Sequence, residues 1–406
     1  MNRILSFVLL ILLLSWGWLF SGVHRVQTSY VHSDSPVYPF LCTNLPEKSE
    51  KQFKERDLYT ESTLGIQNDV QARFVQEDEK KRGETVELSV MFWNVENFFD
   101  WRNDSTTVSD AEFSSRGERR WTWKRFQAKA NAFAKALFWV EGETGRLPEI
   151  IGLAEVENAF VLRQVLQKTA LRKTDYRYVH YDSPDRRGID VALLYRSSVL
   201  ELVDSKPCHL YAGPDSVMAT RDILLCRFQK DSSEFAVLVN HHPSKYGGAA
   251  ESEPRRRIAV ERLHFLADSL ASAGIDRIIA CGDFNDTPDN PVFRLLEPSL
   301  VPMHMDLFRH GFGTIKYDGK WDLIDHFYVS PVFSGQWASS GNNNDEPEEK
   351  ENTDKRPRMR ILRIPFLLTR DTAHSGERPL RTYLGPRYTG GVSDHLPILL
   401  ETELPP

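Results

Sequence analysis

The chain has 406 residues, of which 41% are hydrophobic and 27% are charged. This balance suits a globular protein with one large domain or two smaller ones, and it excludes a disordered polymer. The formal net charge is -6 at pH 7. Overall charge therefore cannot drive nucleic-acid binding, which would need a local basic patch.

Residues 1–21 are predicted to be an export segment. An apolar run follows Arg3 from Ile4 to Leu14 and continues to Phe20, as is typical of a signal peptide. The run also just reaches the roughly 20 apolar residues that a membrane anchor needs, so cleavage and anchoring both stay open. A buried helix is disfavoured because no amphipathic face is visible. We expect an extracytoplasmic protein that is secreted, periplasmic or anchored to the membrane.

The polar residues 22–85 are interpreted as a tether, and an ordered domain is expected over 86–404, where strands and helices alternate. Apolar positions at helical spacing predict two helices, Arg119 to Leu137 and Ala259 to Leu270. Strands are predicted at Val86 to Asn94, Pro148 to Glu155, Asp190 to Tyr195, Phe235 to Asn240 and Arg277 to Cys281. Within this domain, 341–358 has a disordered composition and is expected to be a surface insertion.

The four cysteines lack the spacing of a zinc site. Cys208 and Cys226 could pair in an oxidising compartment or remain buried free thiols, and both alternatives stay open. Cys281 is expected in the core, and Cys42 lies in the tether.

Polar residues cluster at the ends of the predicted strands. The five clusters are Trp93 to Asn97, Leu153 to Asn158, Asn240 to Lys245, Gly282 to Asp286 and Ser393 to Pro397. Each alone fits an ordinary turn or helix cap. Together they predict a site at one edge, where the strands hold the side chains rigidly.

In this order the clusters resemble the endonuclease/exonuclease/phosphatase superfamily, which includes deoxyribonuclease I. The resemblance spans roughly Val86 to Glu403, including the aspartate-bearing stretch Leu323 to Ser330. Further stretches resemble a bacterial extracytoplasmic branch: Arg119 to Arg125, Asp182 to Asp190 and Gly390 to Ser393. The implied fold is an α+β (α/β) four-layer sandwich, with two packed mixed β-sheets flanked by helices.

The resemblance also implies a metal site. Glu155 matches the principal metal ligand, Asn94 matches the amide beside the metal, and Asp394 would complete or support the ligand set. Oxygen ligands without thiolates favour Mg²⁺ or Mn²⁺ over zinc. We therefore expect Mg²⁺ or Mn²⁺ as the cofactor.

Catalytic roles follow from the same match. Asp283 matches the residue that orients or deprotonates the attacking water, and Asn285 matches an amide donor to phosphate or that water. His241 and His395 match the histidines that bind phosphate oxygen or handle protons. Asp325 matches the carboxylate that orients His395, which fixes its tautomer.

Other positions are assigned to the substrate. Ser244 and Lys245 are expected to contact phosphate, and Arg187 to belong to a basic rim, with solvated charge as the alternative. Asp190 is a looser match, expected to orient His241 or face the substrate.

Two histidines stand side by side on one predicted strand. Because successive side chains alternate across a strand, one of the two must point elsewhere. We place His241 in the site and expect His242 to pack against Pro243.

The leading hypothesis is an exported nuclease that hydrolyses phosphodiester bonds by water attack on phosphorus. The alternatives are a sphingomyelinase-like lipid phosphodiesterase and a phosphatase of sugar or inositol phosphates, which would use the same residues with different loops. A non-catalytic binding module is least favoured because the expected residue set is complete. We expect a monomer whose partners are nucleic acid and, during export, the membrane.

Overall fold

The computed structural model describes residues 86–404 except 105–106, 246–247, 298 and 335–356. The expected export segment, the tether, Cys42 and most of the expected insertion lie outside the described residues. Arg358, the last residue of that insertion, begins a strand. Among the described helices, none has the length and apolar character needed to cross a membrane.

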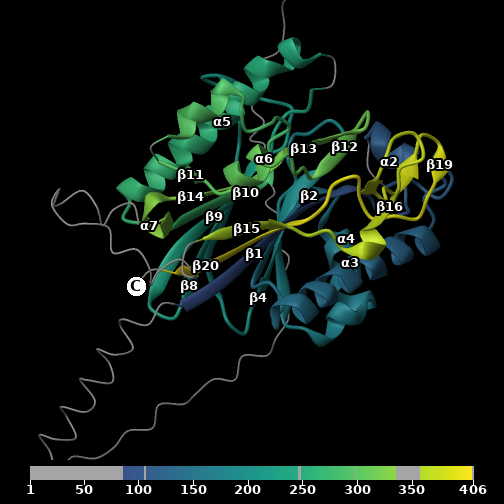
Figure 1. Cartoon of the computed structure of the whole chain (residues 1–406), viewed down its shortest axis with the longest axis horizontal. Coiled ribbons are helices and arrows are strands. Elements are labelled where there is room, and N and C mark those ends of the chain that lie inside the picture. The colour runs from purple at the N-terminus through teal and green to yellow at the C-terminus, as the bar shows by residue number, and fades with distance from the viewer. Residues whose placement is uncertain (1–85, 105–106, 246–247, 298, 335–356, 405–406) are drawn as a thin grey trace, which may run out of the picture. The chain divides into compact units, whose positions relative to one another are not determined.

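Two six-stranded mixed sheets form the centre of the described part of the chain (Figure 1). In spatial order, the first sheet contains β15 (Arg358–Ile361), β20 (Ile398–Leu404), β1 (Val86–Phe98), β2 (Ile150–Val156), β4 (Asp190–Arg196) and β3 (Tyr176–His180). The second sheet contains β11 (Val301–Pro302), β14 (Asp325–Val329), β10 (Ile278–Asp283), β9 (Ser233–His241), β8 (Ile223–Lys230) and β5 (Glu201–Cys208).

The sheets pack face to face and helices cover their outer faces (Figure 1). Helices α3 (Trp123–Thr144) and α4 (Ala159–Lys168) pack on the first sheet, and α5 (Ala249–Ser272) packs on the second. In β1, Val90 and Phe92 pack between the sheets, whereas Met91 and Trp93 face the helices. Both faces of this strand are apolar because both are buried. The four-layer sandwich expected from the sequence is confirmed.

The two sheets pack closely at Gly152 of β2. A Cβ atom at Gly152 would lie 3.1 Å from Sγ of Cys281 and 3.2 Å from the ring of Phe92. Cys281 is fully buried between the sheets. Cys208 and Cys226 are also buried and are free thiols, so the structure contains no bridge between them.

Helix α3 begins four residues later than the periodicity predicts. Its N-cap is Thr122, whose side chain accepts a hydrogen bond from the backbone N–H of Arg125. Arg119 to Trp121 therefore lead into the helix as irregular chain. The spacing of apolar residues predicted the buried face of the helix correctly, but the helix begins where the Thr122 hydroxyl caps it.

Shorter elements complete the described chain. They are α2 (Val108–Glu112), α6 (Met305–Arg309), α7 (Pro331–Ser334), the hairpins β6 (Tyr211–Gly213)/β7 (Ser216–Val217), β12 (Ile315–Tyr317)/β13 (Lys320–Asp322), β16 (Leu368–Arg370)/β17 (Glu377–Pro379) and β18 (Tyr383–Leu384)/β19 (Arg387–Tyr388), and 3₁₀ turns at Ala170–Lys173, Pro291–Leu296 and Pro365–Leu367.

Strand direction brings the polar clusters to one edge, which we call the rim. The rim is formed by the carboxyl ends of β1, β2, β9 and β10 and by the starts of β4, β14 and β20. Strands β1 and β2 run parallel, as do β9 and β10, so their carboxyl ends meet at the same edge. Strands β4, β14 and β20 run antiparallel to their neighbours, so they begin at this edge. In register, Asp283 stands opposite His241 on one side and Asp325 on the other.

Two buried histidines stack behind the second sheet. The rings of His304 and His326 lie 4.1 Å apart between centroids, and neither residue is exposed. Nδ1 of His304 donates to the carbonyl of Phe327 at 3.1 Å. Burial lowers the pKa of His304 to about 4, and burial together with the neighbouring His304 lowers that of His326 well below its usual value. Both rings are therefore neutral in the folded protein.

This burial predicts acid lability. A histidine whose folded pKa lies below its unfolded value of about 6.5 stabilises the fold fully above that pH and loses the contribution as the pH falls towards the folded pKa. His304→Asn keeps a donor for the Phe327 carbonyl but does not titrate. Between pH 7.5 and 5 the wild type should lose about 2 kcal/mol more unfolding free energy than the variant. Urea unfolding at both pH values measures this, and parallel losses would exclude His304 as the titrating group.

Candidate active site

Asp283 is the carboxylate on which the rim side chains converge. It ends β10 and is 2% exposed. Nδ2 of Asn94 donates to its Oδ2 at 2.9 Å, and the backbone N–H of Asn285 donates to its Oδ1 at 2.9 Å. The Nε2 atoms of His241 and His395 lie 3.7 and 3.8 Å from Oδ2. Four segments distant in sequence thus meet at one carboxylate.

Strand alternation explains this convergence. Phe92 in β1 and Cys281 in β10 face the space between the sheets. Asn94 and Asp283 each follow two residues later, so their side chains point to the same face. His241 likewise follows Val239, which faces the same space. The polar side chains therefore continue the inter-sheet layer at its open edge.

His395 is held by a second buried carboxylate. Its Nδ1 lies 2.8 Å from Oδ2 of Asp325, the contact that the expected orienting role requires. Burial alone would lower the pKa of His395, but the charges of Asp325 and Asp283 raise it well above its usual value. The indole N–H of Trp93 fixes the backbone by donating to the His395 carbonyl at 2.9 Å. A cationic ring with its Nε2 towards Asp283 results.

The two adjacent histidines point in opposite directions. Burial and the charge of Arg221 lower the pKa of His241 well below its usual value. His242 faces the α5 side instead, and its ring packs on Phe284 at 4.5 Å. Phe284 is thus a packing partner of the His242 ring, and the expected contact with Pro243 stays a prediction. The carbonyl of His242 accepts from Nδ2 of Asn285 at 2.9 Å, which fixes that amide.

A second group of carboxylates lies beside Asn94. Nη2 of Arg381 lies 2.8 Å from Oδ2 of Asp394 and 3.1 Å from Oε1 of Glu96. Burial and the neighbouring Asp394 raise the pKa of Glu96 to about 7. Burial lowers the pKa of Lys129 to about 8, against the attraction of Glu96, whose carbonyl Lys129 contacts.

Glu155 occupies a strained position at the end of β2. Its φ is +66°, and the neighbouring end of β1 has φ of +47° at Glu96 and +49° at Asn97. Oε2 of Glu155 accepts from the Asn97 N–H at 2.7 Å and lies 3.7 Å from Nη2 of Arg187. Such conformations cost of order 1–3 kcal/mol each and collect at functional sites.

The chemistry of these donors suits a hard divalent cation. Oε1 of Glu155 and Oδ1 of Asp394 make no hydrogen bond or ion pair within the described chain. Asn94 adds an amide oxygen, which already accepts from the Glu96 N–H at 3.0 Å. Carboxylate and amide oxygens are ligands that Mg²⁺ and Mn²⁺ prefer. Asp283, Asp325 and His395 also lie together, but the Nδ1 of His395 is engaged by Asp325, which suits proton handling better.

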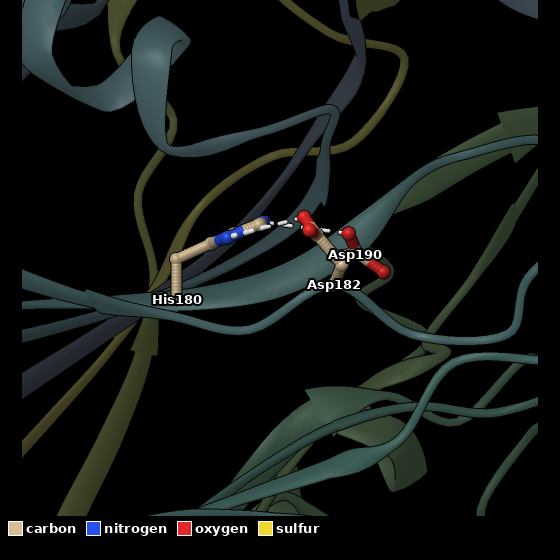
Figure 2. Close-up of side chains that lie close together, drawn as sticks. All are labelled: His180, Asp182 and Asp190. Carbon is tan, nitrogen blue, oxygen red and sulfur yellow. Dashed lines mark ion pairs between the residues drawn. The ribbon is translucent and has the colours of Figure 1, made fainter. Parts of the chain in front are cut away.

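Asp190 lies beside His180 and not beside His241, which corrects the expected contact (Figure 2). Its Oδ2 lies 3.4 Å from Nε2 of His180, and its Oδ1 accepts from the Ser183 N–H at 3.0 Å. Exposed Asp182 reaches Nδ1 of His180 at 3.9 Å. Asp190 lies on the same face of β4 as Ala192 and Leu194, which pack against the helices. His241 belongs to the opposite sheet and faces the space between the sheets, as Val239 does. Asp190 therefore closes the 182–189 loop.

That loop brings Arg187 to the rim. Nη2 of Arg187 donates to Oδ1 of Asn97 at 2.7 Å, and its backbone N–H donates to Asp185 at 3.1 Å. Asp185 pairs with buried Arg221 at 3.3 Å, and Arg221 donates to the His242 carbonyl at 2.7 Å. The loop is thus tied to both sheets.

The remaining substrate candidates lie at the margin. Nζ of Lys245 is 2.7 Å from Oδ1 of Asp286, and Nε of Arg256 is 3.1 Å from Oδ2 of the same carboxylate. Ser244 is half-buried next to Lys245.

Four charged residues of the site were not singled out from the sequence. Glu96 could have been singled out, because it lies in the first polar cluster, two residues after Asn94. Lys129, Arg221 and Arg381 could not, because each reaches the site only through contacts between distant segments.

A family model supports this assignment of fold. The model described as "Endonuclease/Exonuclease/phosphatase family" matches residues 89–404. The sequence comparison with curated proteins found no match.

Three solved structures are similar to this chain at low sequence identity. A mannosyl-6-phosphatase from Bacteroides thetaiotaomicron is 17% identical, with 77% of this chain and 98% of that chain covered and a TM-score of 0.48. The human nocturnin catalytic domain with bound sulfate is 18% identical, with 79% and 96% covered and a TM-score of 0.46. D. rerio TDP2 complexed with single-strand DNA product is 14% identical, with 78% and 98% covered and a TM-score of 0.45.

Proposed function

This chain belongs to the endonuclease/exonuclease/phosphatase family, and we propose that it is a divalent-metal-dependent phosphodiesterase whose substrate is nucleic acid. Hydrolysis of phosphate esters is the activity of the family, and the diester preference and the substrate are our proposal. The observation that carries it is the convergence of Asn94, His241 and His395 on the buried carboxylate of Asp283.

In the proposed reaction a water oxygen bonds to phosphorus while the bond to the leaving oxygen breaks. Asp283 orients this water and accepts its proton, because its carboxylate lies where the rim donors converge. His395, held by Asp325, donates from Nε2 to a phosphoryl oxygen on which charge develops. Asn285 and His241 bind the phosphate from the side of the second sheet.

The oxygen donors beside Asn94 would hold Mg²⁺ or Mn²⁺, with Glu155, Asp394 and Glu96 as the carboxylates. The bound cation would neutralise negative charge on the phosphate. Arg381 keeps Glu96 and Asp394 together by contacting both. Arg187 stands beside Glu155, where its half-exposed guanidinium can bind a phosphate oxygen.

Basic side chains around the rim favour a polyanionic substrate. Arg187, Lys245, Arg381 and Arg119 lie there although the whole chain is acidic. Local positive charge of this kind is what nucleic-acid backbones require. A lipid or a small phosphomonoester would use the same catalytic residues, so the test must include both.

The proposal is tested with a substrate panel. The full chain is incubated with plasmid DNA, RNA, sphingomyelin, bis-p-nitrophenyl phosphate and p-nitrophenyl phosphate, in Mg²⁺, Mn²⁺ or EDTA. We expect cleavage of DNA or RNA and of the synthetic diester with metal, and none in EDTA. Full activity in EDTA would exclude the metal, and a preference for the monoester or for sphingomyelin would refute the nuclease assignment.

Asp283→Asn and His395→Ala are each expected to lower kcat on the order of 10²-fold or more. If both residues act on one step, the double variant should be much less impaired than the product of the two single losses. Asp289→Asn, which removes an exposed carboxylate six residues from Asp283, is the matched control. Near-wild-type rates in folded single variants would remove both residues from the mechanism.

We also propose that residues 1–21 export the enzyme, as a signal peptide or as an anchor. The support is the apolar run from Ile4 to Phe20 behind Arg3. A reporter fused to residues 1–27 should cross the cytoplasmic membrane, and the same fusion with Leu9→Arg and Leu12→Arg should not. A wild-type fusion that stays in the cytoplasm refutes the export assignment.

A further inference from the structure

A cavity of about 200 Å³ opens next to the proposed metal ligands. It lies between the end of β1 and the β18–β19 hairpin, and Figure 1 shows this hairpin beside α2. Its wall includes Glu96 and Asn97, together with Arg119, Arg381 and Tyr383. A larger cavity, about 690 Å³, is lined by residues at the far ends of β4 and β8 and offers none of the rim chemistry. The smaller cavity shares Glu96 and Arg381 with the proposed site.

Both arginines in the wall retain hydrogen-bonding capacity. Nε of Arg119 lies 2.7 Å from Glu112, and its Nη1 donates to the carbonyl of Gly385. Arg381 uses Nε and Nη2 for Glu96 and Asp394. Within the described chain, Nη2 of Arg119 and Nη1 of Arg381 make no hydrogen bond or ion pair.

Arg119 is held in place from several sides. Its guanidinium lies over the rings of Phe113 and Tyr383, at 5.7 and 5.5 Å from the centroids. Its carbonyl accepts from the Tyr383 hydroxyl at 2.8 Å and from Nη1 of Arg125 at 2.8 Å. The stretch Arg119 to Arg125 thus builds a rigid wall, and a preorganised guanidinium loses little entropy when it binds an anion.

The acid in the wall does not oppose an anion strongly. Glu96 accepts from the Thr382 N–H at 2.7 Å and is paired with Arg381. The two guanidinium groups therefore outnumber the one carboxylate among the charged groups of the cavity wall.

We propose that this cavity binds a second phosphate group of the substrate, beside the phosphate that is hydrolysed. This inference rests on the proposed function and deepens it, because it selects phosphoesters that carry two phosphates. Planar guanidinium groups match the oxygens of a phosphate in charge and geometry. The second phosphate could be the neighbouring link of a polynucleotide or a terminal phosphate, and the substrates below distinguish these sources.

The first experiment compares dinucleotides. A dinucleoside monophosphate is assayed against the same compound with an added 5′-phosphate, an added 3′-phosphate or a further internal link. The wild type should favour one of the doubly phosphorylated compounds by about 10-fold or more in kcat/KM. Arg119→Met should bring this ratio close to one. Arg116→Met, which removes an exposed arginine outside the cavity, should keep the wild-type ratio.

A structural role for Arg119 gives a different result. If Arg119 only joins α2 to the hairpin, Arg119→Met lowers the rates on all substrates together and leaves the ratio unchanged, which overturns the proposal. Arg119→Lys serves if the methionine variant does not fold, because it keeps the charge beside Glu112 but not the two-pronged donor. It should lose most of the preference, and a fully retained preference also overturns the proposal.

The second experiment needs no turnover. Calorimetry in EDTA measures inorganic phosphate binding to the full chain, and Arg119→Met should weaken it about 10-fold, whereas Arg116→Met should not. If phosphate binding depends on Arg119 but no substrate of the panel is hydrolysed, the proposed function is refuted and the phosphate site is retained. If the panel shows turnover but Arg119→Met does not change phosphate binding, the phosphate site is refuted and the proposed function is retained.

Discussion

The burial of one carboxylate between two sheets is the constraint on which the rest of the site depends. Asp283 is 2% exposed, and an unpaired charge at such a depth would cost several kcal/mol. The compensating groups come from both sheets: Asn94 lies in the last third of β1, His395 precedes β20, and His241 ends β9. The packing of the sheets and the geometry of the site are therefore one arrangement, and a shift of either sheet would separate Asp283 from its partners.

Asn94 divides the site into two parts with different chemistry. Its Nδ2 donates to Asp283, and its Oδ1 accepts from the Glu96 N–H. On one side lie the groups suited to move protons, and on the other lie the carboxylates suited to hold a cation. Because one amide contacts both sides, its orientation fixes the distance between them. The cavity beside Arg119 adjoins the carboxylate side, where a substrate that extends beyond the reacting phosphate would pass.

The sequence predicted what is local. The five strands predicted from alternation all lie within strands of the two sheets or overlap them, whereas β3, β5, β8, β11 and β15 were not predicted. Asn94 points to the same face of β1 as Phe92, as alternation requires. The contact of Asp190 with His180 could not be predicted from alternation alone, because it also depends on which strands share a sheet. Arg221 and Arg381 could not be found, because each is brought to the site by loops whose paths no local pattern describes.

Crystals grown with Mn²⁺ would show, through the anomalous signal of the metal, whether Glu155 is a metal ligand. We expect a peak within bonding distance of a carboxylate oxygen of Glu155 and close to Asn94, and loss of that peak in Glu155→Gln. A peak at His180 and Asp190, the other histidine and carboxylate group near the rim, with none at Glu155 would contradict the account. Absence of any peak at saturating Mn²⁺ would contradict it as well.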